Sequence, residues 1–223
     1  MKRWKKPVKV LVGILAVIGV VFAVFGIKWA VKSAKIDDDY TAILTDAAYS
    51  QPVAVRGVTP IEQEISCGYA VIEMLASRAG KDVTEESLFA ANGDKVTTAM
   101  GSGFERELAK QFPEYTVRRY ENLSNSEVLE KIYVGLANGF PVPIEFAALY
   151  GGTEWTLHFA LVTAMDLQND SIEVVNPYGY IEYYTVEELL AAMRYESYEN
   201  MPFFLRLGFL AEIFTRNTLY TME

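Results

Sequence analysis

Hydrophobic residues occur in two ways along the chain: as one uninterrupted run near the N-terminus and as periodic patterns in the remainder. The run, VLVGILAVIGVVFAVFGI, consists of 18 uncharged residues from Val10 to Ile27. A helix of this length reaches roughly 27 Å, close to the thickness of the hydrocarbon core of a bilayer. The run has no polar face, which a helix packed on a soluble core would need. It therefore predicts a transmembrane helix.

Five later segments combine a helical period with residues that start or end helices. In the first of them, Val71, Met74 and Leu75 are spaced as i, i+3 and i+4, which places them on one helical face. Ser66 before this segment is a suitable N-cap, and Gly80 is a suitable end. The predicted helices cover residues 67–80, 85–93, 102–112, 125–138 and 186–194, and a shorter one lies within residues 37–48.

Strand patterns dominate the second half of the chain. Residues 156–164 are apolar on both faces, as expected for a central strand. The predicted strands cover residues 115–120, 142–147, 156–164, 171–175 and 180–185, with turns at 166–170 and 176–179. The tail, residues 203–222, fits either a buried helix or an edge strand. Helices followed by a run of antiparallel strands predict an α+β domain.

Charge divides the chain just after the apolar run. Residues 1–36 carry eight Lys or Arg and no acidic residue, whereas residues 37–223 carry 12 basic and 29 acidic residues, a net charge of −17. Five basic residues precede the run and three follow it, so the positive-inside rule places the N-terminus in the cytoplasm and the body outside. A cleaved signal peptide is the alternative. Lysines follow the run where a cleavage site needs small residues, which favours an uncleaved signal anchor.

The composition excludes several classes of function. One cysteine and one histidine in 223 residues can form neither an intramolecular disulfide nor a zinc site of the usual Cys and His ligands. The net charge of −9 leaves no basic surface for nucleic acid. A hydrophobic content of 51% excludes a disordered chain.

The single cysteine and the single histidine have both a structural and a chemical interpretation. Each, taken alone, is most simply a buried core residue. However, Cys67 directly follows the N-cap Ser66, and the N-terminus of a helix favours a thiolate. A nucleophilic cysteine needs a base, and His158 is the candidate that the chain offers.

Asn176 is the candidate partner of His158. Positions 158 and 176 are symmetric about residue 167, in the middle of the turn segment 165–170. If the flanking strands form a hairpin about that centre, His158 and Asn176 face each other, and opposed Cβ atoms are about 4.5 to 5.5 Å apart. The Asn176 oxygen could then accept from an imidazole N–H and fix the tautomer.

Three blocks of sequence surround these residues. They are QEISCGYA at 63–70, LHFALV at 157–162 and VNPYG at 175–179, and GFPV at 139–142 precedes the second block. Together they resemble the motifs of papain-like cysteine peptidases related to the bacteriocin double-glycine leader peptidases. The resemblance covers about residues 60–195.

The resemblance implies an antiparallel sheet that carries His158 and Asn176, packed against a helix that presents Cys67. Cys67 would be the nucleophile, His158 its general base and then acid, and Asn176 the residue that orients the imidazole. The reaction would proceed through a thioester, with an oxyanion hole formed by the Cys67 backbone N–H and a nearby amide side chain. This chemistry implies no cofactor and no metal.

The chain departs from the family at the oxyanion glutamine. That residue usually lies about six positions before the cysteine, where this chain has Ile61. The nearest glutamine is Gln63, four positions before Cys67. Either Gln63 still reaches the hole or the hole lacks its side-chain donor, which can reduce the rate about 10²- to 10³-fold.

We therefore expect three parts: residues 1–36 as a basic stub and transmembrane signal anchor, 37–60 as a lead-in or linker, and 61–223 as a papain-like domain. The expected function is a membrane-anchored cysteine peptidase that cleaves a peptide or protein substrate outside the cytoplasm. The alternative is a catalytically weak or inactive peptide-binding domain that retains the peptidase fold. A structural membrane protein with a purely structural Cys67 and His158 is the third possibility.

Overall fold

The computed structural model describes residues 6–33, 39–93, 103–148 and 156–195, then 202, 204, 205, 208, 211 and 213–223. The domain boundary expected at residue 36 lies outside these residues. The helices are α1 (Lys6–Ser33), α2 (Thr41–Thr45), α3 (Cys67–Arg78), α4 (Glu85–Asn92), α5 (Gly103–Gln111), α6 (Asn125–Ala137) and α7 (Val186–Met193), with a 3-10 turn at Ala47–Tyr49. The strands are β1 (Val53–Ala54), β2 (Val117–Tyr120), β3 (Val142–Ala148), β4 (Thr156–Asp166), β5 (Ser171–Asn176), β6 (Tyr180–Tyr184) and β7 (Thr218–Met222).

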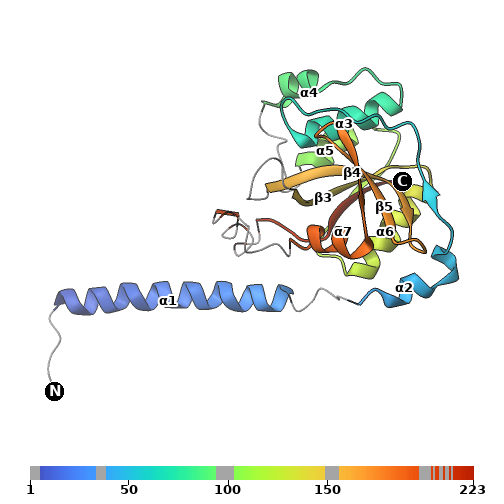
Figure 1. The fold of residues 1–223 in the computed structure, drawn as a ribbon. Helices are drawn as coiled ribbons and strands as arrows, with labels where there is room; N and C mark the ends of the chain where they lie inside the picture. The colour runs from blue at the N-terminus through green and yellow to red at the C-terminus, as the bar shows by residue number, and fades with distance from the viewer. Residues whose placement is uncertain are drawn as a thin grey trace.

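An antiparallel sheet organises the domain. Its strand order is β2-β7-β3-β4-β5-β6, and the short β1 pairs with β4 beyond the end of β3. In Figure 1, α3, α4 and α5 lie on one side of the sheet and α6 and α7 on the other. The side chains form two hydrophobic clusters, one containing residues of α6 and α7 and one containing residues of α3 and α5. This mixed helix and antiparallel sheet architecture confirms the predicted α+β class.

The predicted helix starts are confirmed at their capping residues. Ser66 accepts a hydrogen bond from the backbone N–H of Tyr69 at the start of α3. Thr84, Ser124 and Thr185 each form a reciprocal capping box at the starts of α4, α6 and α7. Such caps satisfy backbone N–H groups that have no partner within the helix. Local sequence therefore determines where these helices begin.

The N-terminal helix α1 is long and apolar enough to cross a membrane. Its candidate span, Val8–Ile27, has 20 residues and a mean hydropathy of 3.0, and none of it is buried against the rest of the chain. A signal sequence near an N-terminus would have the same properties. The apolar helix predicted from the sequence is thus present.

The segment expected as a lead-in packs onto the domain. Ile43 of α2 is buried in the cluster that contains α6 and α7, and Val55 donates a backbone hydrogen bond of 2.8 Å to Thr163 of β4. The hydroxyl of Tyr133 on α6 donates to the carbonyl of Gln51 at 3.0 Å. Residues 39–55 therefore contribute to the domain's packing.

The end of the chain forms an internal strand, so neither structure expected for the tail is correct at Thr218–Met222. β7 lies between β2 and β3, and all five of its residues are buried. Its pairing partners are far away in sequence, with Val117 opposite Met222 and Ile144 opposite Leu219. A strand position set by such distant partners leaves no local sequence signal.

Because β7 is internal, truncating its buried side chains is expected to destabilise the domain. Leu219 is fully buried, and Leu219→Ala should lower the free energy of unfolding by about 2 to 5 kcal/mol. Val134→Ala on the exposed face of α6 is the control and should change it by less than about 0.5 kcal/mol. Urea unfolding of the full chain in detergent micelles measures both. Equal stabilities of the two variants would contradict an internal position for β7.

Candidate functional site

Cys67 is the first residue of α3, directly after the cap Ser66, as predicted. Its side chain is buried, with 5% of its surface exposed. The backbone N–H of Phe159 favours the ionised form of the Cys67 thiol, against the larger opposing effect of burial on its pKa. Phe159 is the neighbour of His158 on β4. The first and second sequence blocks therefore meet at Cys67.

A carboxylate that the sequence analysis missed holds the segment before Cys67. Glu85, the first residue of α4, accepts hydrogen bonds from the backbone N–H groups of Glu64, Ile65 and Ser66 at 3.1, 2.9 and 3.0 Å. Its own side chain is buried. An acidic residue in the first turn of a helix is common, so nothing in the sequence distinguishes Glu85 from exposed Glu86 beside it. In three dimensions Glu85 holds the segment that leads into Cys67.

His158 and Asn176 are hydrogen-bonded. Nε2 of His158 lies 2.9 Å from Oδ1 of Asn176, and the two side chains are 3% and 1% exposed. The ring of Tyr178 stacks on the imidazole with centroids 4.2 Å apart and planes at 18°. Phe146 packs on the imidazole in a tilted arrangement, with centroids 5.7 Å apart. The imidazole is thus held by one hydrogen bond and by two rings.

The strand register that brings His158 close to Asn176 differs from the expected one. The pairing of β4 with β5 ends at Leu161 opposite Val175, and it shifts between Val162 and Ala164. Continuing the register places Asn176 opposite Ala160, so His158 is a diagonal neighbour of Asn176. The Cα atoms of diagonal neighbours are about 7 to 8 Å apart, a distance that long side chains can bridge. The expectation that the two residues face each other directly is therefore wrong.

Gln63 lies beside the third sequence block. Its backbone N–H donates to the carbonyl of Pro177 at 2.7 Å, and Glu62 forms an isolated β-bridge with Tyr178. The side-chain Oε1 of Gln63 is buried and has no hydrogen-bond partner among the described residues. The contacts Gln63–Pro177, Cys67–Phe159 and His158–Asn176 connect all three blocks.

Burial determines the ionisation of the two reactive groups. Burial raises the pKa of the Cys67 thiol to about 11, although hydrogen bonds from the backbone N–H groups of Phe159 and Gly68 oppose this. Burial also lowers the pKa of His158 to about 4, against the opposing effect of the Asn176 hydrogen bond. Both groups are therefore neutral at pH 7. The thiolate expected from the helix N-terminus is wrong for the resting site, because desolvation outweighs these hydrogen bonds.

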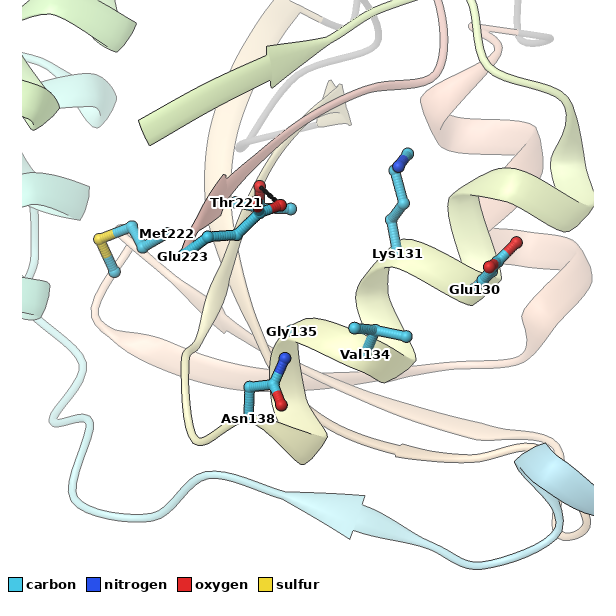
Figure 2. A pocket seen from close by; sticks show the side chains of 8 residues that line it. All are labelled: Glu130, Lys131, Val134, Gly135, Asn138, Thr221, Met222 and Glu223. Atoms are coloured by element: carbon cyan, nitrogen blue, oxygen red, sulfur yellow. Dashed lines mark hydrogen bonds between the residues drawn. The ribbon is translucent and has the colours of Figure 1, made fainter. Parts of the chain in front are cut away.

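A separate surface hollow lies between α6 and the end of the chain (Figure 2). It has a volume of about 160 Å³ and is lined by Glu130, Lys131, Val134 and Gly135 of α6, by Asn138 just after this helix, and by Thr221, Met222 and Glu223. None of the four candidate site residues lines it. Within the part of the chain that the structure describes, no group of three or more His, Cys, Asp or Glu side chains could hold a metal ion.

Comparisons with known proteins identify similar sequences and folds. The model of the Peptidase_C39 like family matches residues 55–203. One similar structure is a double glycine motif protease from an AMS/PCAT transporter in complex with the leader peptide, with 15% identity, coverage of 77% of this chain and 96% of that chain, and a TM-score of 0.47. Another is the peptidase domain of Streptococcus ComA, a bi-functional ABC transporter involved in a quorum sensing pathway, with 14% identity, 74% and 98% coverage, and a TM-score of 0.47. No curated protein matches the chain.

The raised pKa of Cys67 predicts how its alkylation depends on pH. Because the thiolate is the reactive form, the rate with iodoacetamide should still be rising at pH 9.5, with a slope of about one decade per pH unit. A short peptide with an internal cysteine is the control, and its rate should level off above its pKa of about 8.5. The single cysteine lets intact-mass measurement follow the reaction. A plateau between pH 6 and 8 would contradict the neutral resting thiol.

Removing the Glu85 carboxylate should loosen the segment before Cys67. Glu85→Ala leaves three backbone N–H groups without their acceptor, and we expect a loss of about 2 to 3 kcal/mol in the free energy of unfolding. Hydrogen exchange at Ser66 should also accelerate. Glu86→Ala, one residue along and exposed, is the matched control and should leave both quantities unchanged. Similar effects of the two substitutions would rule out this role of Glu85.

Proposed function

This chain belongs to the Peptidase_C39 like family, whose model matches it over residues 55–203, and on that basis we propose that it is a membrane-anchored cysteine peptidase. Its substrate is a peptide or protein, and the hydrolysed bond is a peptide or amide bond outside the cytoplasm. The matched region contains Cys67, His158, Asn176 and Gln63. The observation that supports these roles most strongly is the 2.9 Å contact between His158 and Asn176. The next residue on β4 after His158 is Phe159, whose backbone N–H acts on the Cys67 thiol.

In the first half of the reaction, the Cys67 thiol transfers its proton to His158 as the sulfur attacks the substrate carbonyl carbon. Transfer between a neutral thiol and a neutral imidazole suits a buried pair, because the site stays neutral until the bond forms. The carbon–nitrogen bond then breaks, and the imidazolium gives its proton to the leaving amine. The product on the enzyme is a thioester at Cys67.

In the second half, His158 takes a proton from water, and the resulting nucleophile attacks the thioester carbon. The carbon–sulfur bond breaks, the carboxylic acid is released, and the proton returns to Cys67. In both halves negative charge develops on the substrate oxygen. The backbone N–H of Cys67 and the side-chain amide N–H of Gln63 are the donors that we assign to that oxygen.

The membrane assignment rests on α1 and on the charges beside it. The span Val8–Ile27 has the length and hydropathy of a membrane helix. Five basic residues before the span and three after it favour a cytoplasmic N-terminus and a domain outside. The net charge of −17 on residues 37–223 would mildly favour cationic substrates, and salt would screen the effect.

An inactive peptide-binding domain is the second candidate function. It is favoured by the raised pKa of Cys67, because an unactivated thiol is a poor nucleophile at neutral pH. Chemical reactivity toward a peptide-like electrophile separates the two candidates.

A peptide epoxide directed at cysteine peptidases is the test, applied to the full chain in detergent micelles. We expect the wild type to be labelled at neutral pH, Cys67→Ala not to be labelled, and His158→Ala to be labelled at least about 100-fold more slowly because the general base is lost. Tyr183→Phe on the exposed part of β6 is the control and should be labelled at the wild-type rate. Equal labelling of the wild type and Cys67→Ala would refute a Cys67 peptidase. Equally slow labelling of the wild type and His158→Ala would favour the inactive binding domain.

A further inference from the structure

The Asn176 amide makes hydrogen bonds at both of its ends. Its Oδ1 accepts from the backbone N–H of Tyr178 at 3.0 Å and lies 2.9 Å from Nε2 of His158. Its Nδ2 donates to Oε2 of Glu182 at 2.8 Å. Glu182 is on β6, and sequence analysis gave it no role. Since Asn176 is 1% exposed, the amide has little access to water and depends on these partners.

We propose that Glu182 is a positioning residue of the active site, which holds the Asn176 amide with its oxygen toward His158 and so selects the imidazole tautomer that can act as the base. This inference rests on the proposed function for its catalytic meaning. Its structural part concerns the resting protein and is tested without turnover.

The hydrogen-bonding roles determine that tautomer. An ionised carboxylate only accepts hydrogen bonds, so the end of the Asn176 amide that faces Glu182 must be the NH₂ group. The other end is the carbonyl oxygen, which also only accepts, so Nε2 of His158 must carry the proton. Nδ1 then has the free lone pair. Glu182, together with the backbone N–H of Tyr178 at the other end of the amide, thereby determines through Asn176 that Nδ1 is the nitrogen able to take the Cys67 proton.

The sheet holds Glu182 in place for this role. β5 and β6 pair with Val174 opposite Glu182 and Asn176 opposite Tyr180, so Asn176 and Glu182 are diagonal neighbours on one face. The hydroxyl of Tyr184 donates to the same Oε2 at 3.0 Å. Burial, with the nearby Glu182 charge, raises the pKa of Tyr184, so this hydroxyl stays protonated and remains a donor. Glu182 therefore accepts two hydrogen bonds from side chains on its own face of the sheet.

The negative charge of Glu182 also affects the Asn176 amide. No salt bridge joins Glu182 to any residue that the structure describes. Its negative charge therefore acts on its two hydrogen-bond donors, the Tyr184 hydroxyl and the Asn176 amide, and it polarises the amide so that Oδ1 becomes a stronger acceptor. A stronger acceptor stabilises the imidazolium that forms when His158 takes the proton.

The test reads the tautomer of His158 directly. His158 is the only histidine, so nitrogen-15 NMR of the full chain with labelled histidine, in detergent micelles at pH 8, gives one imidazole without assignment. We expect the wild type to have a single tautomer protonated at Nε2. Glu182→Met, which has similar length but no acceptor, should populate both tautomers, and Glu182→Gln, which retains an acceptor oxygen, should restore the single tautomer.

Labelling by the peptide epoxide supplies a kinetic readout in the same variants. Glu182→Met should lower kinact by about tenfold with KI unchanged, since the lost hydrogen bond acts through His158 and not on the probe. Glu173→Gln is the matched control, because Glu173 is a half-buried carboxylate on β5 that accepts from Thr163 and Tyr183 and not from Asn176. It should match the wild type in tautomer and in kinact.

A single Nε2-protonated tautomer in Glu182→Met would overturn the proposal, as would equal damage in Glu182→Gln and Glu182→Met. If Glu182→Met does not fold, Glu182→Ala provides the same comparison. A wild type that resists the epoxide but shifts its tautomer in Glu182→Met would refute the proposed function and leave the role of Glu182 intact. Labelling of the wild type by the epoxide, together with an unchanged tautomer in Glu182→Met, would support the proposed function and refute the role of Glu182.

Discussion

The extension of β4 beyond the end of β5 is the constraint on which the arrangement of the site depends. β4 has 11 residues and β5 has six, and their pairing ends at Leu161 opposite Val175. The first residues of β4, from Thr156 to Phe159, therefore extend past the last residue of β5. This free edge lets the start of α3 approach β4, so that the backbone N–H of Phe159 is available to the Cys67 sulfur. A longer β5 would occupy that edge.

The free edge also lies where the two hydrophobic clusters meet. Cys67 and Phe159 belong to the cluster that contains α3 and α5. Phe146 and Tyr178, which hold the imidazole of His158, belong to the cluster that contains α6 and α7. Packing on both faces of the sheet excludes water from Cys67 and from His158. That exclusion raises the pKa of Cys67 and lowers that of His158, so the proposed chemistry begins from two neutral groups.

Much of this could be predicted from the sequence, because it depends on local interactions. Caps such as Ser66 and Thr185 mark helix starts within a few residues, and apolar periods identify β3 to β6. The motif blocks pointed to Cys67, His158 and Asn176. The symmetric hairpin failed because its centre was misplaced: Asp166 pairs with Ser171, which centres the turn between Gln168 and Asn169 and not at Leu167, and the bulge between Val162 and Ala164 then shifts the register by one residue. Glu85 and Glu182 were missed for a related reason: each acts on a segment brought near by the fold, and neither has a local pattern.

The central claim is that Cys67 forms a thioester with the help of His158, and intact-mass spectrometry tests it most directly. The full chain would be mixed with a pool of short peptide p-nitrophenyl esters and quenched in acid, and its single cysteine leaves one possible site for a thioester. We predict acyl adducts that neutral hydroxylamine removes, formed far more slowly in His158→Ala. Adducts that resist hydroxylamine, or that form equally fast without the imidazole, would contradict the account.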